Sequence, residues 1–134
     1  MEFTHHHAQI LTLKAIEKAL TDFKKPICVA ICDKFGFLLS FTRMENAPIR
    51  SIEISICKAY TAARMTINTD QFLAKIHKDN LSPSFFCDTK LTALPGGAIL
   101  KDEMGNIIGA VGVSGLNVNE DQMIANMMVE QLLK

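Results

Sequence analysis

The sequence has no tryptophan, no excess of charge of either sign and no long apolar run. Fourteen Lys and Arg residues balance fourteen Asp and Glu residues among 134. Phosphate binding draws on surplus cations, so this balance argues against nucleic acid or an anionic membrane as a partner. No stretch approaches the roughly 20 apolar residues of a membrane helix. The first residues form no apolar signal segment, and we expect a cytoplasmic, single-domain protein.

The four cysteines show no metal-binding or redox spacing, since no C-x-x-C occurs. Cys28 and Cys32 fall in an apolar run of strand length, where a separation of four residues places them about 13 Å apart. A disulfide needs Cα atoms within about 7 Å. We therefore expect reduced thiols that fill core space.

Two D-x-x-G motifs predict β-hairpins. Asp33 to Gly36 follows the apolar run 27–32, and Asp102 to Gly105 follows residues 98–101. Aspartate accepts hydrogen bonds from nearby backbone amides, and glycine adopts the positive φ that ends such a turn. Residues 37–43 and 106–113 would return as the second strands. Both hairpins are expected to join one antiparallel sheet flanked by helices.

Periodic apolar residues predict helices between and around these hairpins. The first helix is expected over 9–24, after a flexible segment at 1–8, and the others after Pro48, over 69–77, and after an Asn119 cap. A short strand is expected at residues 85–87. The expected buried stripes are Leu13, Ile16, Leu20 and Phe23 in the first helix, and Ile49, Ile52, Ile56, Ala59 and Ala63 in the second. This order gives an α+β domain over residues 9–134.

The glycine cluster 105–115 does not match a nucleotide-binding loop, because neither G-x-G-x-x-G nor Gly-Lys-Ser/Thr occurs. Glycines inside a strand mark a close approach of another backbone or of a ligand. Packing of a helix on the sheet is one interpretation. The other is that Ser114 and Gly115, just before the last helix, offer amides to a carboxylate or phosphate.

Histidine is confined to His5, His6, His7 and His77, so a Ser–His or Cys–His catalytic pair would have to use His77. The three N-terminal histidines are weak candidates for a metal or haem ligand, since neutral imidazole is the commonest metal ligand. Histidines at a chain end are more often incidental or left by a purification tag. No catalytic constellation stands out, and whether the protein is an enzyme is left open.

Arg43 and Lys58 are the more informative cations. Arg43 closes a predicted strand, and Lys58 interrupts an apolar helix, where it either extends to water along its apolar stem or meets an anion. We predict a ligand-binding cleft in which Arg43, Lys58, Ser114 and Gly115 face an anionic group.

These segments together resemble a known family. Arg43-Met44-Glu45-Asn46-Ala47-Pro48, Lys58-Ala59-Tyr60-Thr61-Ala62, Pro95-Gly96-Gly97 and Gly109 to Gly115 are similar to the GlcG/HbpS-like family. This family is also called DUF336 or haem-degrading and includes the C-terminal domain of PduO-type proteins. The resemblance spans residues 10–132.

The resemblance implies a profilin-like three-layer α/β/α domain with a five-stranded antiparallel sheet. It also implies homo-oligomers, from dimers up to octamers, that hold haem, a corrinoid or a small anionic metabolite. Such a protein would be accessory to glycolate, diol or glycerol utilisation inside the cell. The alternatives are an enzyme acting on a small anionic metabolite and a purely structural oligomeric scaffold.

Overall fold

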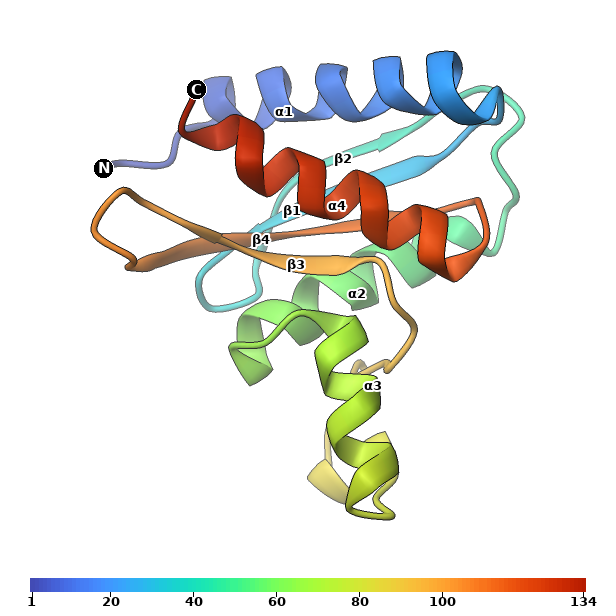
Figure 1. Cartoon of the computed structure of the whole chain (residues 1–134), viewed down its shortest axis with the longest axis vertical. Coiled ribbons are helices and arrows are strands. Elements are labelled where there is room, and N and C mark those ends of the chain that lie inside the picture. The colour runs from blue at the N-terminus through green and yellow to red at the C-terminus, as the bar shows by residue number, and fades with distance from the viewer.

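A four-stranded antiparallel sheet lies between two helical layers (Figure 1). The computed structural model describes all 134 residues. The strands are β1 (Cys28–Asp33), β2 (Leu38–Arg43), β3 (Gly97–Lys101) and β4 (Ile107–Ser114), in the order β2-β1-β4-β3. Helices α1 (His5–Lys18) and α4 (Val118–Leu132) cover one face, and α2 (Ser51–Met65) covers the other. The predicted α+β class and single antiparallel sheet are confirmed.

The sheet has four strands, so the expectation of a fifth strand is wrong. Residues Pro83–Phe86 form the short 3-10 helix η2, which lies beside α3 (Thr69–Lys78) on an arm that projects from the body (Figure 1). Pro83 has no N–H to donate to a ladder. The Ser82 hydroxyl accepts a hydrogen bond from the Ser84 amide, and Cys87 ends the turn at φ 59°. The local chemistry at 82–87 therefore favours a helical turn.

The two hairpins form as predicted and use the same hydrogen bonds. Asp33 Oδ1 accepts from the amides of Phe35 and Phe37 at 2.9 and 3.0 Å. Asp102 Oδ1 accepts from the amides of Met104 and Asn106 at 3.0 and 2.9 Å. The central β1–β4 pairing is also antiparallel and joins the two hairpins into one sheet.

Helix α1 begins four residues earlier than predicted, so residues 5–8 are helical. Thr4 caps it, and His7 completes the capping box. The expected buried stripe is wrong in part. Leu13 is 66% and Leu20 is 55% exposed, whereas Ile16 and Phe23 are half-buried and pack against the core. The buried side instead consists mainly of small residues, namely Ala8, Leu11, Ala15 and Ala19. Alanines let the helix lie close to α4 and the sheet, which leaves the larger apolar side chains outside. A single π-helical turn, Ala19–Phe23, then ends the segment.

Helix α2 also buries small residues, and its expected stripe is wrong in part. Ile49 is 77% exposed and precedes the helix, and Ile52 and Ile56 are half-buried, whereas Ala59 and Ala63 are buried as predicted. A Cβ on Gly112 would collide with the Ser55 carbonyl and would lie 2.6 Å from the Ala59 amide nitrogen. Gly112 of β4 therefore admits the α2 backbone, which supports the packing interpretation of the glycine cluster.

The last helix is capped two residues before the predicted position. Asn117 is the N-cap, and Glu120 closes the capping box. This start places Asp121 at the beginning of α4 with its side chain inside the domain. No helix in the structure is long and apolar enough to span a membrane.

Candidate functional site

Lys58 lies in the interior, where it joins three elements. Its side chain is 1% exposed, and its ammonium donates to the Val113 carbonyl at 2.8 Å and to Asp121 Oδ2 at 3.0 Å. The other carboxylate oxygen of Asp121 accepts from the Leu116 amide at 3.0 Å. The anion that Lys58 meets therefore belongs to the same chain. This interaction ties α2 to the end of β4 and to the start of α4.

Burial dominates the electrostatics of this pair. It lowers the pKa of Lys58 and raises the pKa of Asp121, while the mutual attraction opposes both shifts. The hydrogen bonds to Val113 and Leu116 give both charges further partners, which is what a buried ion pair needs to persist. We therefore take the pair to be ionised and structural.

The remaining predicted residues reach the same end of the sheet. Cys28 of β1 pairs with Arg43 on one side and with Ser114 on the other, so the three side chains share one face. Ala30 and Cys32 lie on the same face of β1 as Cys28, because side chains two and four positions apart in a strand point the same way. Both pack on Ala59, so this face of the sheet carries α2. Gly115 follows directly at φ +132°, where a Cβ would lie 2.7 Å from the Pro26 carbonyl oxygen.

Proximity alone does not give these residues a common ligand. The Arg43 guanidinium donates to the Ala47 carbonyl through Nε at 3.3 Å and Nη2 at 2.9 Å, which closes the turn after β2. Ser114 is buried, and Lys58 is neutralised by Asp121. An anion contact by Arg43, Lys58, Ser114 and Gly115 stays a prediction. Of the two alternatives for Lys58, the structure shows the contact with an anion, and that anion is Asp121.

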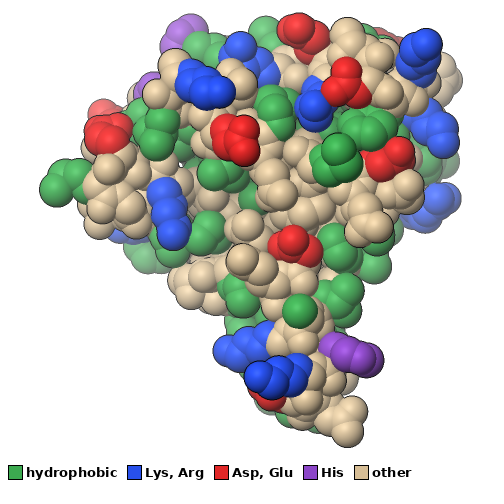
Figure 2. Space-filling model, viewed as in Figure 1, with side chains coloured by type: hydrophobic (Ala, Val, Ile, Leu, Met, Phe, Trp, Pro, Cys, Tyr) green, Lys and Arg blue, Asp and Glu red, His purple; other side chains and the backbone are tan.

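The N-terminal histidines occupy the first turns of α1, and they differ in what they contact. His7 is committed to the cap, because its Nδ1 accepts from the Thr4 amide at 3.1 Å and its ring stacks on Phe3 with centroids 5.8 Å apart. His5 and His6 are exposed. Figure 2 shows histidine side chains at the surface beside the N-terminal end of α1. All three histidines therefore lie in the first turn of α1, within the segment predicted to be flexible.

His6 continues into an exposed apolar stripe. Ile10 and Leu13 follow at spacings of four and three residues, so the three side chains lie along one side of the helix. Leu13 lies about 200° around the axis from the buried Ala15, at 100° per residue. Ile10 is 40% exposed, and Leu20 extends the apolar surface by two further turns. We call His6, Ile10, Leu13 and Leu20 the outer face of α1.

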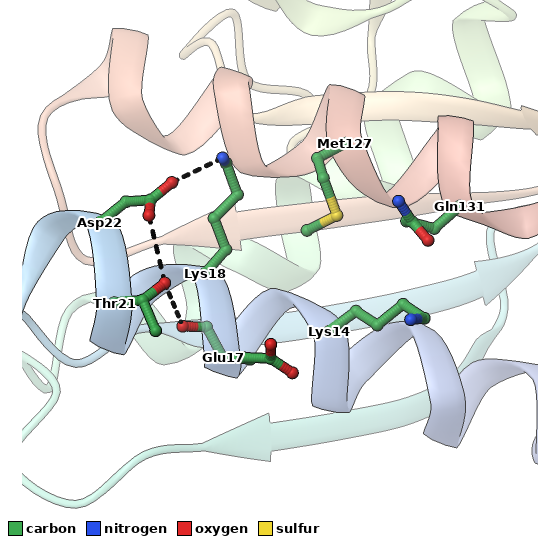
Figure 3. Close-up of a pocket in the computed structure, with 7 residues that line it drawn as sticks. All are labelled: Lys14, Glu17, Lys18, Thr21, Asp22, Met127 and Gln131. Atoms are coloured by element: carbon green, nitrogen blue, oxygen red, sulfur yellow. Dashed lines mark hydrogen bonds and ion pairs between the residues drawn. The ribbon is translucent and has the colours of Figure 1, made fainter.

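A shallow polar groove runs beside the C-terminal half of this helix, between α1 and α4 (Figure 3). It has a volume of about 250 Å³, with Met127 as its one apolar lining residue. Lys18 is paired with Asp22 at 2.8 Å, whereas Lys14 makes no ion pair. Lys14 is therefore a cation next to the outer face that is free to meet a carboxylate of a ligand.

The structure holds no cluster of three or more His, Cys, Asp or Glu side chains that could chelate a metal ion.

Comparison with known proteins assigns the chain to a family. The family model described as "Haem degrading protein HbpS-like" matches residues 3–130. The chain belongs to the HbpS-like family. The resemblance drawn from the sequence motifs is confirmed by this match.

Solved structures and one curated protein agree with this assignment. PduOC, crystallised as a complex with haem, is 28% identical, with a TM-score of 0.86 over 97% of this chain and 94% of that chain. The protein ORFY of Klebsiella pneumoniae, a DUF336 member, is 26% identical, with a TM-score of 0.86 over 98% and 92%. An uncharacterised 15.0 kDa protein from the dhaT–dhaS intergenic region of Citrobacter freundii is 28% identical over 87% of this chain and 83% of its own length.

HbpS shares the fold. A double mutant of Streptomyces reticuli HbpS is 22% identical, with a TM-score of 0.88 over 100% of this chain and 89% of that chain. At this identity the likeness concerns architecture alone. HbpS and this chain therefore share a fold, and that likeness assigns no ligand-binding residue in this chain.

Proposed function

We propose that this HbpS-like protein binds haem on the outer face of α1. The observation that carries the proposal is an exposed imidazole, His6, in line with the exposed apolar side chains of Ile10 and Leu13. Histidine is a common axial ligand of haem iron, and apolar side chains suit the face of a porphyrin.

The residues present fit the other needs of a haem. Lys14 makes no ion pair and adjoins Leu13, so its ammonium is free to meet a propionate. His5 is a second exposed imidazole, but at 100° per residue it lies off the line of His6, Ile10 and Leu13. The relative PduOC, crystallised with haem and covered over nearly its whole length, supports the ligand class.

We infer that copies of this chain associate and that the outer face of α1 is covered in the assembly, with the haem held between the copies. Isolated soluble domains seldom expose such a row of large apolar side chains. The edge strand β2 adds to the uncovered apolar surface, since Leu38 and Leu39 are both exposed. A self-complementary contact would give a dimer, and repeated contacts would give assemblies up to the octamer that the family resemblance implies.

A corrinoid or a small anionic metabolite is the alternative ligand. A corrinoid is also a large macrocycle whose metal accepts an imidazole, so the same surface would suit it. The relative in the dhaT–dhaS intergenic region supports an accessory role beside enzymes that use small metabolites.

Haem titration followed at the Soret band tests the proposal. The wild-type protein is expected to shift and saturate the band, and His6→Ala is expected to lose at least tenfold in affinity while it keeps its circular dichroism. His77→Ala, which removes an exposed histidine on α3, is the matched control and should bind like the wild type. Equal affinity in His6→Ala and His77→Ala would contradict the site, and a parallel titration with aquocobalamin tests the corrinoid.

A further inference from the structure

A second hollow lies on the opposite side of the sheet, where three distant segments of the chain meet. The β1–β2 hairpin contributes Phe37, helix α2 contributes Ile56, Tyr60 and Arg64, and the loop after η2 contributes Lys90. We call it the Tyr60 pocket. Its volume is about 250 Å³, and it is more enclosed than the groove of Figure 3. This size is just below the range of about 300–1,000 Å³ for drug-sized ligands.

Much of the lining is apolar and reachable from solvent. Phe37 is 64% exposed, and Ile56 on α2 is half-buried. The Tyr60 ring forms one wall, and its hydroxyl donates to Asp88 Oδ2 at 2.6 Å, which fixes the ring in place. An apolar or aromatic body of a small molecule would meet a preformed surface here.

Two cations face the same tyrosine ring and, after the hydrogen bond from Tyr60, both lower the pKa of the nearby Asp88 carboxyl by their charge. The Arg64 guanidinium carbon lies 4.8 Å from the Tyr60 ring centroid, and the Lys90 ammonium lies 5.4 Å from it. Neither takes part in an ion pair, since the pairs in the structure are Met1–Asp102, Lys18–Asp22 and Lys58–Asp121.

The Arg64 side chain is held in a defined position. Its Nε donates to the Phe35 carbonyl, and its guanidinium also lies 5.9 Å from the Phe37 ring centroid. No protein acceptor engages its two terminal amino groups. A guanidinium with its stem fixed and its terminal groups free is suited to a carboxylate, which it binds through parallel hydrogen bonds.

The acidic groups nearby limit the charge of a ligand. Asp88 is engaged by the Tyr60 hydroxyl and by the Lys90 amide at 3.1 Å. Glu53 is the one carboxylate in the lining, and it makes no ion pair. Asp88 keeps its negative charge, since both of its donors are neutral, so the two cations face two carboxylates. The capacity for one further carboxylate therefore lies in the terminal amino groups of Arg64, which no protein acceptor engages.

From this arrangement we propose that the Tyr60 pocket binds a small monocarboxylate with an apolar or aromatic body. The carboxylate would lie between Arg64 and Lys90, and the body would lie on Phe37 and Ile56. This site shares no residue with the outer face of α1, so it stands or falls independently of haem binding.

Isothermal titration of the intact protein with benzoate tests the proposal, with benzamide as the uncharged molecule of the same shape. Benzoate is expected to bind at least tenfold more tightly than benzamide, because hydrogen bonds to a charged acceptor are stronger than those to a neutral one. Arg64→Met keeps the apolar stem and should weaken benzoate binding at least tenfold. Lys90→Met should weaken it in the same direction.

Arg50→Met is the matched control, since Arg50 is an exposed arginine just before α2 that does not line the pocket. It is expected to bind benzoate like the wild type. Benzoate binding that is absent at 10 mM, equal to that of benzamide, or unchanged in both Arg64→Met and Lys90→Met would overturn the proposal. Haem titration of the same variants should give wild-type curves.

Discussion

The Lys58–Asp121 pair and the outer face of α1 differ in whether their polar groups are already bound within the chain, and in both cases the residue type suggests the opposite. Lysine in an apolar helix is a common sign of a ligand site, yet Lys58 is enclosed and bound by Asp121 and the Val113 carbonyl. Histidines near a chain terminus are commonly incidental, yet His6 lies on an ordered helix and in line with Ile10 and Leu13. The interior pair is satisfied within the chain, and the outer face is not.

This difference shows which groups of the protein are free to bind a ligand. A charge whose partners all lie within the fold stabilises the fold and has nothing left for a ligand. An exposed imidazole beside uncovered apolar side chains has both a free donor atom and surface to bury. We therefore expect substitutions in the interior to act on stability and substitutions on the outer face to act on binding and assembly.

The largest effect is expected from Lys58→Ala. Removal of one partner leaves Asp121 buried without its counter-charge, and such losses cost about 3–5 kcal/mol. Urea denaturation followed by circular dichroism should show this drop in the free energy of unfolding. The double variant Lys58→Met/Asp121→Leu removes both charges and should recover most of it. If the Lys58→Ala variant is stable and specifically loses ligand affinity, Lys58 is a ligand-binding residue and the prediction is wrong.

A smaller effect is expected from alkaline pH acting on the interior. Burial raises the pKa of the Cys32 thiol to about 12 from 9.0. Between these values the unfolded chain loses the thiol proton and the folded chain keeps it, so the free energy of unfolding falls as pH rises. The slope from one thiol approaches about 1.4 kcal/mol per pH unit.

Denaturation curves between pH 8 and 11 check this expectation. Cys32→Ala should show a shallower decline than the wild type, whereas Cys87→Ala, which changes an exposed cysteine on the arm, should follow the wild type. Parallel declines in all three proteins would show that the Cys32 thiol does not titrate differently in the two states.

The smallest effect on stability is expected from Leu13→Glu. The side chain is 66% exposed, so the free energy of unfolding should change by no more than about 0.5 kcal/mol. The added charge on the outer face should shift the protein towards smaller assemblies in light scattering. Leu133→Glu, at an exposed position near the C-terminus, should leave the assembly size unchanged. A wild type that is already monomeric at micromolar concentration would contradict the assembly.

The hairpins could be predicted from the sequence because their cause is local. Asp33 and Asp102 each accept hydrogen bonds from amides two and four residues ahead, and the following glycine allows the turn to close. All of these groups lie within five residues of one another.

The helix faces could not be predicted, because α1 and α2 carry more than one candidate apolar stripe. In α1 the leucines at 13 and 20 and the alanines at 8, 15 and 19 both follow a helical period. The alanines are buried because α4 and the sheet lie close to the helix axis. That spacing is a tertiary property that periodicity does not contain.

The Lys58–Asp121 pair was missed for a related reason. The two residues are 63 positions apart, and two overlapping cap signals, Asn117 with Glu120 and Asn119 with Gln122, were available at the start of α4. The structure uses the first pair, which places Asp121 inside, beside Lys58. The sequence pattern alone does not choose between the two caps.

One paired measurement tests most directly whether the outer face of α1, rather than the interior pair, binds the ligand. Haem affinity and the free energy of unfolding are determined for His6→Ala and for Lys58→Met/Asp121→Leu, both against the wild type. We predict that His6→Ala loses haem affinity at unchanged stability, and that the charge-free double variant folds and keeps wild-type haem affinity. Loss of haem binding in the folded double variant, together with wild-type binding in His6→Ala, would contradict the account.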